Sequence, residues 1–139
     1  MSEQQQQRSE ESLRHEYSEV AQNVRHYSNL RFAMFTIFFA VSGGVGFVAF
    51  GRGQFNAQAA FIARISGFPV IAFFWWYFER LDQLLAHHVA GAAALDRSLG
   101  YTNFSSRPVK HHFRAVGRIF FVLLTLLWVY AVYSVPLGS

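Results

Sequence analysis

The chain has 139 residues, of which 53% are hydrophobic and 18% aromatic but only 14% charged. Soluble domains carry about 25% charged residues, so this composition excludes an ordinary soluble globule and favours a membrane protein. The net charge of +4 is explained by where the basic residues lie relative to the apolar blocks, as described below, and we expect no nucleic acid partner. Cysteine is absent, which excludes disulfides, thiolate metal sites and thiol nucleophiles.

The first part of the chain is polar. Residues 1–8 are low in complexity, and we expect them to be a disordered tail. Ser9 followed by Glu10 and Glu11 is typical of a helix start, because the hydroxyl caps free amides and the carboxylates face the positive end of the helix dipole. Helical spacing of apolar residues predicts a cytoplasmic helix over residues 9–31. That stripe consists of Leu13, Tyr17, Val20, Val24 and Tyr27.

Three apolar blocks follow, at residues 32–51, 59–78 and 119–137. Each is about 20 residues long, which is enough for a helix to cross the hydrocarbon core of a bilayer. The fold class is therefore an all-α membrane protein with three transmembrane helices, the lipid bilayer being its first partner. A short connection joins the first two blocks, so their helices must run antiparallel as a hairpin.

The second helix is predicted to continue past its apolar block over residues 79–99. Gly100 is a typical C-terminal stop, and residues 100–107 form a loop after it. The apolar spacing here gives a second stripe that can pair with the stripe of residues 9–31, so the two helices extend into a cytoplasmic antiparallel stalk. This stripe includes Leu81, Leu85, Ala92 and Leu95.

The positions of the basic residues predict the orientation. Ten of the twelve precede the first block or lie between the second and third. The positive-inside rule places these segments in the cytoplasm, with the amino terminus inside and the carboxyl terminus outside. We expect a multi-pass protein of the bacterial inner membrane.

Small residues lie at similar depth in the first two blocks. Ala59, Ala63 and Gly67 have the spacing that lets helix backbones approach closely in lipid, and they are candidate helix-packing residues. The first block contributes Gly43, Gly44 and Gly46. Packing within the hairpin is one interpretation, and packing between subunits is the other.

Arg64 is the charged residue that lies inside an apolar block. It is near the outer end, so its side chain can extend to the headgroups; alternatively, it faces a water-filled path between subunits, where a ring of arginines favours anions. Pro69 predicts a kink one turn deeper in the same helix. These two residues and the three glycines are the candidate pore or gate.

Arg31 and Glu79 flank the cytoplasmic ends of the first two spans. The hairpin brings them to one level, which predicts an interfacial ion pair, with Asn29 and Asp82 close enough to extend it.

No residue pattern predicts catalysis, and we expect a protein without enzyme activity, metal or cofactor. The histidines all fall on the predicted cytoplasmic side, outside the spans, which argues against haem held between helices. Adjacent histidines also diverge on a helix and make poor paired metal ligands, whereas pH sensing stays open. They are His15, His26, His87, His88, His111 and His112.

Three segments carry a family resemblance: residues 27–32 (YSNLRF), 78–80 (FER) and 99–101 (LGY). With them, residues 10–101 resemble small bacterial membrane proteins, the SLATT superfamily and the RipA-like octameric membrane proteins, in which a cytoplasmic helix leads into a transmembrane hairpin. The resemblance implies an inner-membrane oligomer and, for the SLATT type, a pore-forming effector. The predicted third span departs from that pattern.

Two functions follow from these observations. The leading hypothesis is a non-enzymatic homo-oligomer that forms a regulated pore or alters permeability, because three thin helices cannot enclose a pore alone. The alternative is a membrane-anchored interaction module or accessory subunit that docks a cytoplasmic protein partner through the stalk.

Overall fold

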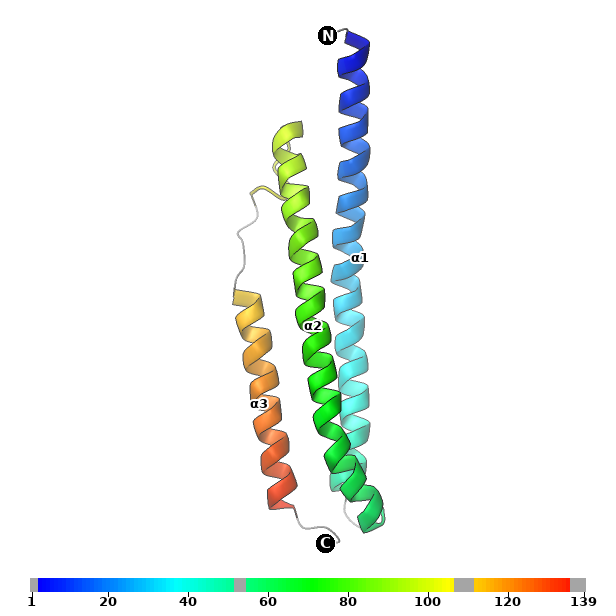
Figure 1. Cartoon of the computed structure of the whole chain (residues 1–139), viewed down its shortest axis with the longest axis vertical. Helices are drawn as coiled ribbons and strands as arrows, with labels where there is room; N and C mark the ends of the chain where they lie inside the picture. Colours follow the sequence, from blue (N-terminus) through cyan, green and yellow to red (C-terminus); the bar gives the residue numbers. More distant parts are fainter. Residues whose placement is uncertain (1–2, 52–54, 107–111, 136–139) are drawn as a thin grey trace. The chain divides into compact units, whose positions relative to one another are not determined.

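The computed structural model describes residues 3–51, 55–106 and 112–135, and the side chains of residues 9–51, 55–106 and 115–135. This part of the chain contains three α-helices and no strand: α1 (Glu3–Phe50), α2 (Ala57–Leu99) and α3 (His112–Ser134) (Figure 1). Each helix is long and apolar enough to cross a membrane. The predicted all-helical class is confirmed.

Helix α1 is a single helix from Glu3 to Phe50, so the expected polar helix and the first apolar block are continuous. It begins before Ser9, and residues 3–8 are helical where we expected disorder. The reason is composition, because Gln and Glu have unbranched side chains that lose little freedom in a helix. Residues 1 and 2 lie outside the described residues.

Helix α2 has a defined cap at each end. The Asn56 side chain accepts a hydrogen bond from the Ala59 amide at 2.7 Å, which is a typical N-cap. At the other end Gly100 has a φ of 70°, and the Tyr101 amide donates to the Asp96 carbonyl at 2.8 Å. That bond defines a Schellman motif, so the predicted stop at Gly100 is confirmed. Helix α2 also passes through Pro69 without ending.

Helix α3 begins at His112 and ends at Ser134. The last residue of the predicted loop and the last two of the predicted third span, residues 136 and 137, lie outside the described residues. So do residues 52–54 of the connection between the first two spans.

The chain divides into two compact units. One consists of Met1–Arg31 and Arg80–Lys110 and is called the polar unit here; the other, Phe32–Glu79 and His111–Ser139, is called the apolar unit. The boundaries at residues 31/32 and 79/80 fall within one residue of the ends of the first two apolar blocks, whereas the boundary at 110/111 precedes the third block by eight residues.

In the polar unit, α1 and α2 run antiparallel. Tyr17 contacts Tyr101 with ring centroids 5.5 Å apart, and Tyr27 stacks on His88 at 5.1 Å. In these two contacts the residue number increases along α1 while it decreases along α2, as expected for antiparallel helices. The two apolar stripes face each other. Both stripes supply buried or half-buried side chains: Leu13, Tyr17, Val20, Val24 and Tyr27 from α1, and Leu81, Leu85, Ala92 and Leu95 from α2.

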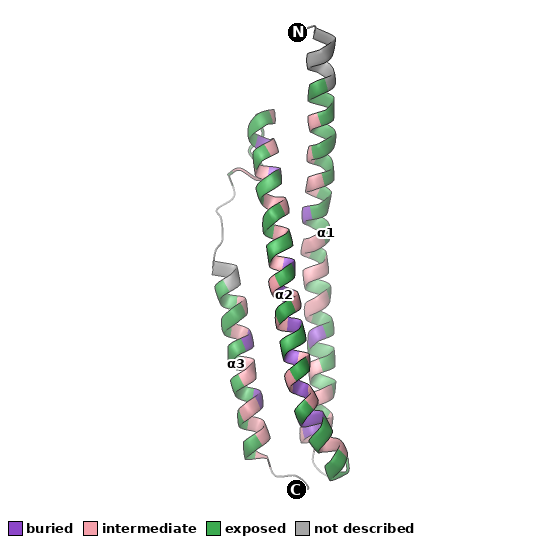
Figure 2. Ribbon diagram, in the orientation of Figure 1, coloured by how far each residue is buried: buried purple, intermediate pink, exposed green. Residues whose placement is uncertain are grey.

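In the apolar unit, all three helices contribute to a small aromatic core. Phe38 of α1 is 1% exposed and meets Phe74 of α2 at 5.1 Å and Phe121 of α3 at 5.5 Å, in the edge-to-face arrangement that aromatic quadrupoles favour. Outside this core, exposed positions dominate (Figure 2). The apolar unit holds 19 of the 21 large hydrophobic side chains that are exposed in the described chain. It is therefore apolar inside and outside.

Gly67 of α2 is required by the position of Trp128 on α3. A Cβ atom at residue 67 would lie 2.1 Å from the indole ring, closer than any van der Waals contact. A Cβ at Gly43 would meet no atom within 4 Å. A methyl group therefore clashes at Gly67 and fits at Gly43.

We predict that Gly67→Ala destabilises the protein by about 1–3 kcal/mol, because the buried indole must move. The matched change Gly43→Ala is neutral or stabilising by up to about 1 kcal/mol, since alanine lowers the entropy cost of the helix. Thermal unfolding of the two purified variants in detergent measures both effects. Equal melting temperatures would contradict this close packing of Trp128 on α2.

Candidate functional site

The strongest polar feature of the apolar unit is Arg64 of α2. Its side chain is buried, with the residue only 5% exposed. Nε donates to the Ala49 carbonyl at 3.1 Å, and Nη1 donates to the Val135 carbonyl at 2.6 Å. Arg64 therefore connects α2 to residues at the C-terminal ends of α1 and α3. We call these three residues the arginine clamp.

The acceptors of the clamp explain why a charge is tolerated there. The last four carbonyls of a helix have no partner within the helix, and the C-terminal end carries partial negative charge. Ala49 lies in the last turn of α1, and Val135 follows the last residue of α3. A guanidinium group has donors in several directions and stays charged, so it can satisfy both ends at once.

Two aromatic residues also lie beside Arg64. The guanidinium carbon lies 5.3 Å from the Phe50 ring centroid, within cation–π range. The Trp128 indole N–H donates to the Arg64 main-chain carbonyl at 3.0 Å. The structure thus differs from the expectation of an arginine extended to the headgroups, because acceptors inside the protein were not visible in the sequence.

An apolar cavity of about 540 Å³ adjoins the clamp within the apolar unit. Phe50, Trp128 and Val135 belong to its lining as well as to the surroundings of Arg64, and Ser42 and Gly43 line it from α1. Of the candidate pore or gate residues, Gly43 and Arg64 thus lie near one cavity. Pro69 is exposed, and a Cβ at Gly46 would be 3.8 Å from the Trp128 ring.

The small residues of α2 face two different neighbours. Ala59 and Ala63 line a second, apolar hollow of about 420 Å³ together with Gly44 of α1. Gly67 instead lies under Trp128 of α3. The predicted packing set is therefore divided between the neighbouring helices.

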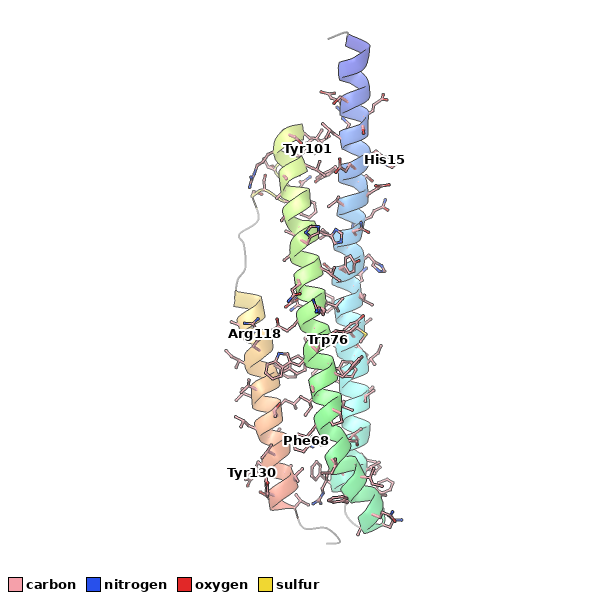
Figure 3. All side chains as sticks on the ribbon, in the orientation of Figure 1. His15, Phe68, Trp76, Tyr101, Arg118 and Tyr130 are labelled. Carbon is pink, nitrogen blue, oxygen red and sulfur yellow. The ribbon has the colours of Figure 1, made fainter. Side chains whose placement is uncertain are left out.

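Arg31 and Glu79 each have an ion-pair partner inside their own unit, and the predicted pair between them stays a prediction. Arg31 contacts Asp82 at 3.2 Å, and Glu79 accepts two hydrogen bonds from Arg118 of α3, at 2.6 and 3.0 Å. Arg118 lies near the start of α3 (Figure 3). Asp82 is nearly one helical turn beyond Glu79 and offers Arg31 a carboxylate on the same face. The sequence did not show that the third helix would supply a cation to Glu79.

In the polar unit, Asp96 closes the end of α2. The residue is fully buried, and its carboxylate accepts the Phe104 amide at 2.5 Å and the Ser105 amide at 2.9 Å. The loop also packs on α1, because Tyr17 meets Phe104 with ring centroids 6.1 Å apart. Tyr101 follows the end of α2 (Figure 3). We call Asp96 with residues 101–106 the loop clasp.

The loop clasp also determines the ionisation of Asp96. Burial acts to raise the pKa of the carboxyl group, but hydrogen bonds from the Ser105 and Phe104 amides and from the Tyr17 side chain outweigh it. The pKa therefore lies below its usual value. Asp96 was not predicted from the sequence. The available signal was an acidic residue four positions before Gly100, which ends the helix and is followed by a short polar loop.

No group of three metal-ligating side chains occurs in the described part of the chain. His88 stacks on Tyr27, and His15 lies 3.6 Å from Glu19 on the surface. The side chains of His111 and His112 lie outside the described residues.

Comparison of the chain with protein-family models, curated proteins and solved structures finds no match.

The arginine clamp generates a prediction about stability. Arg64→Leu removes a charged donor from two carbonyls and should lower the free energy of unfolding by about 3 kcal/mol. Arg64→Lys should restore only part of it, because an ammonium group lacks the planar fork. The exposed change Arg25→Leu is the control, with an effect within about 0.5 kcal/mol. Denaturant unfolding measures all three; unchanged stability of Arg64→Leu would contradict the clamp.

The loop clasp generates a prediction about pH. Because the folded pKa of Asp96 is lowered, the ionised carboxylate stabilises the clasp above the unfolded pKa of about 3.9. That stability is lost as the pH falls through the folded value. Hydrogen exchange of the Phe104 and Ser105 amides should therefore show full protection at pH 5 and loss of protection below about pH 4.

Asp96→Asn removes the ionisable carboxyl group of residue 96 but keeps a side chain of nearly the same shape. The variant should show weaker protection at pH 7 and no further acid-dependent loss, whereas Glu16→Gln on the exposed face of α1 should behave as the unmodified protein. Acid-dependent loss of protection that persists in Asp96→Asn would show that another group controls the loop.

Proposed function

We propose that this chain is a membrane-anchored, non-enzymatic interaction module. The apolar unit spans the bilayer with three helices, and the polar unit lies in the cytoplasm and docks a partner protein. The observation that carries this proposal is the partition of exposed apolar side chains, 19 of 21 of which belong to one unit. Exposed apolar surface on that scale needs hydrocarbon around it.

The placement of charge supports the same orientation. Of the 20 Lys, Arg, Asp and Glu residues, 15 lie in the polar unit. The basic residues of the polar unit favour the cytoplasmic side of a bacterial inner membrane by the positive-inside rule. Three hydroxyls in the apolar unit, those of Thr36, Ser66 and Thr125, donate to main-chain carbonyls of their own helices, Thr125 to Phe121 at 2.8 Å, which suits a medium without water.

The use of Arg64 favours a module over a pore. A pore-lining arginine needs its guanidinium group in contact with water and ions. Here the residue is 5% exposed, and its guanidinium group donates to two main-chain carbonyls. Its charge therefore supports the architecture of the anchor.

The docking surface is best sought outside the apolar stripes of the polar unit, because Leu81 and Ala92 are buried in the pairing of α1 with α2. Leu84 is 44% exposed and is the large hydrophobic side chain of the polar unit that lies exposed on α2. An apolar anchor within a charged surface is typical of a protein-binding patch.

A second candidate function is the homo-oligomeric pore. The hollow formed by Gly44, Ala59 and Ala63 favours it, since small residues allow a helix of a second copy to approach closely. Its test is ion flux in proteoliposomes, which Gly44→Leu should abolish if the hollow is the subunit interface.

The membrane orientation can be tested with single cysteines, since the chain has none of its own. Ser18→Cys and Gln58→Cys both replace exposed residues, one on α1 in the polar unit and one at the start of α2. In intact spheroplasts, a membrane-impermeant maleimide should label residue 58 only, and residue 18 should react after permeabilisation. Labelling of residue 18 in intact cells, or recovery of the protein in the soluble fraction, would contradict the orientation.

The docking surface can be tested with a photo-reactive amino acid placed at residue 84. We expect one dominant cross-linked product with another protein, identified by mass spectrometry, and loss of that partner in Leu84→Asp. The same amino acid at the exposed residue Ala86, which points elsewhere on the helix, is the control. Cross-links to the chain itself, together with ion flux in proteoliposomes, would favour the pore.

A further inference from the structure

We propose that the apolar cavity beside the arginine clamp binds a neutral, lipid-soluble molecule that carries a carbonyl or hydroxyl acceptor on an apolar frame. The inference rests on the proposed insertion of the apolar unit in a bilayer. It adds a ligand site that neither the module nor the pore requires.

The size and walls of the cavity suit such a ligand. Its volume of about 540 Å³ lies within the range of about 300–1,000 Å³ that is usual for small-molecule sites. Helices α1, α2 and α3 all line it, with aromatic rings from Phe38, Phe50 and Trp128. Ser42 excepted, every described residue of the lining is apolar or glycine, so a charged ligand would find no counter-charge there.

Ser42 is the polar residue of the described lining. Its hydroxyl oxygen is buried and has no hydrogen-bond partner among the described residues. Other hydroxyls on these helices donate to the carbonyl four residues earlier, as Thr36 and Thr125 do. A buried hydroxyl left without an acceptor is costly, and a ligand acceptor would remove that cost.

The position of Ser42 restricts the ligand further. Residue 42 lies near the middle of the apolar block at residues 32–51, about 15 Å from either surface of a hydrocarbon core of about 30 Å. The polar groups of a phospholipid stay at the surface, so an ordinary acyl chain would leave the hydroxyl unpartnered. The acceptor must belong to a molecule that dissolves wholly in the hydrocarbon.

Gly43 keeps part of this space empty. It lines the cavity beside Ser42, and a Cβ atom built on it would meet nothing within 4 Å. A methyl group at residue 43 therefore displaces no protein atom. We expect the longer side chain of Gly43→Leu to block the site, and leucine is a good helix former.

Trp128 gives the site an optical signal. The chain has three tryptophans, and Trp75→Phe with Trp76→Phe leaves only Trp128, which lines the cavity. The protein is placed in lipid nanodiscs and titrated with a brominated long-chain ketone, because bromine quenches indole fluorescence on contact. The first control is a brominated alkane with the same chain but no carbonyl acceptor. The second is a brominated phospholipid, whose quenching shows whether an acyl chain of the bilayer contacts Trp128.

We expect saturable quenching by the ketone, with about fivefold weaker binding of the alkane and of the ketone to Ser42→Ala, which is the effect of one hydrogen bond. Gly43→Leu should abolish the saturable phase while its melting temperature and emission maximum stay those of the parent. Quenching that is equal for ketone and alkane, or unchanged by Gly43→Leu, would overturn the site. Quenching by brominated phospholipid alone would assign the cavity to an acyl chain.

The cysteine labelling described above measures membrane insertion independently of ligand binding. Correct labelling of residues 18 and 58 with no saturable quenching would overturn the ligand site and leave the anchor intact. Soluble protein with no labelling pattern would overturn both.

Discussion

The guanidinium group of Arg64 binds two helix ends that would otherwise have unsatisfied carbonyls in apolar surroundings. Its hydrogen bonds to Ala49 and Val135 bring residues at the ends of α1 and α3 to one point on α2. In water those carbonyls could bond to solvent, but in hydrocarbon each would cost several kcal/mol. Arg64 removes that cost for both carbonyls, at the C-terminal ends of α1 and α3.

The packing of Trp128 follows from the same point. Its indole donates to the main-chain carbonyl of Arg64 and lies where a Cβ at Gly67 would be. The indole therefore forms part of the surroundings of the clamp and one wall of the cavity. Gly43 lines the cavity and adds no side chain to it.

Periodicity and composition predicted the helices, because long apolar blocks and a glycine stop depend on residues close in sequence. The Schellman motif at Gly100 follows directly from that residue's freedom at positive φ. The partners of charged residues could not be predicted in this way. Arg118 reaches Glu79 only because α3 packs in the apolar unit, and the carbonyl acceptors of Arg64 are invisible in a list of side chains. The carboxylate of Asp96 likewise needs the backbone of a loop whose path the sequence does not give.

The contact between Arg64 and the end of α3 tests this account most directly, and solid-state NMR can measure it in a lipid bilayer. The protein is labelled with ¹⁵N in arginine side chains and ¹³C in valine carbonyls, and Arg64→Lys identifies the signal of residue 64. We expect strong dephasing of the Val135 carbonyl by the Arg64 guanidinium, and no exchange of that guanidinium with bulk water. An Arg64 side chain that exchanges freely with water and leaves Val135 unaffected would contradict the clamp.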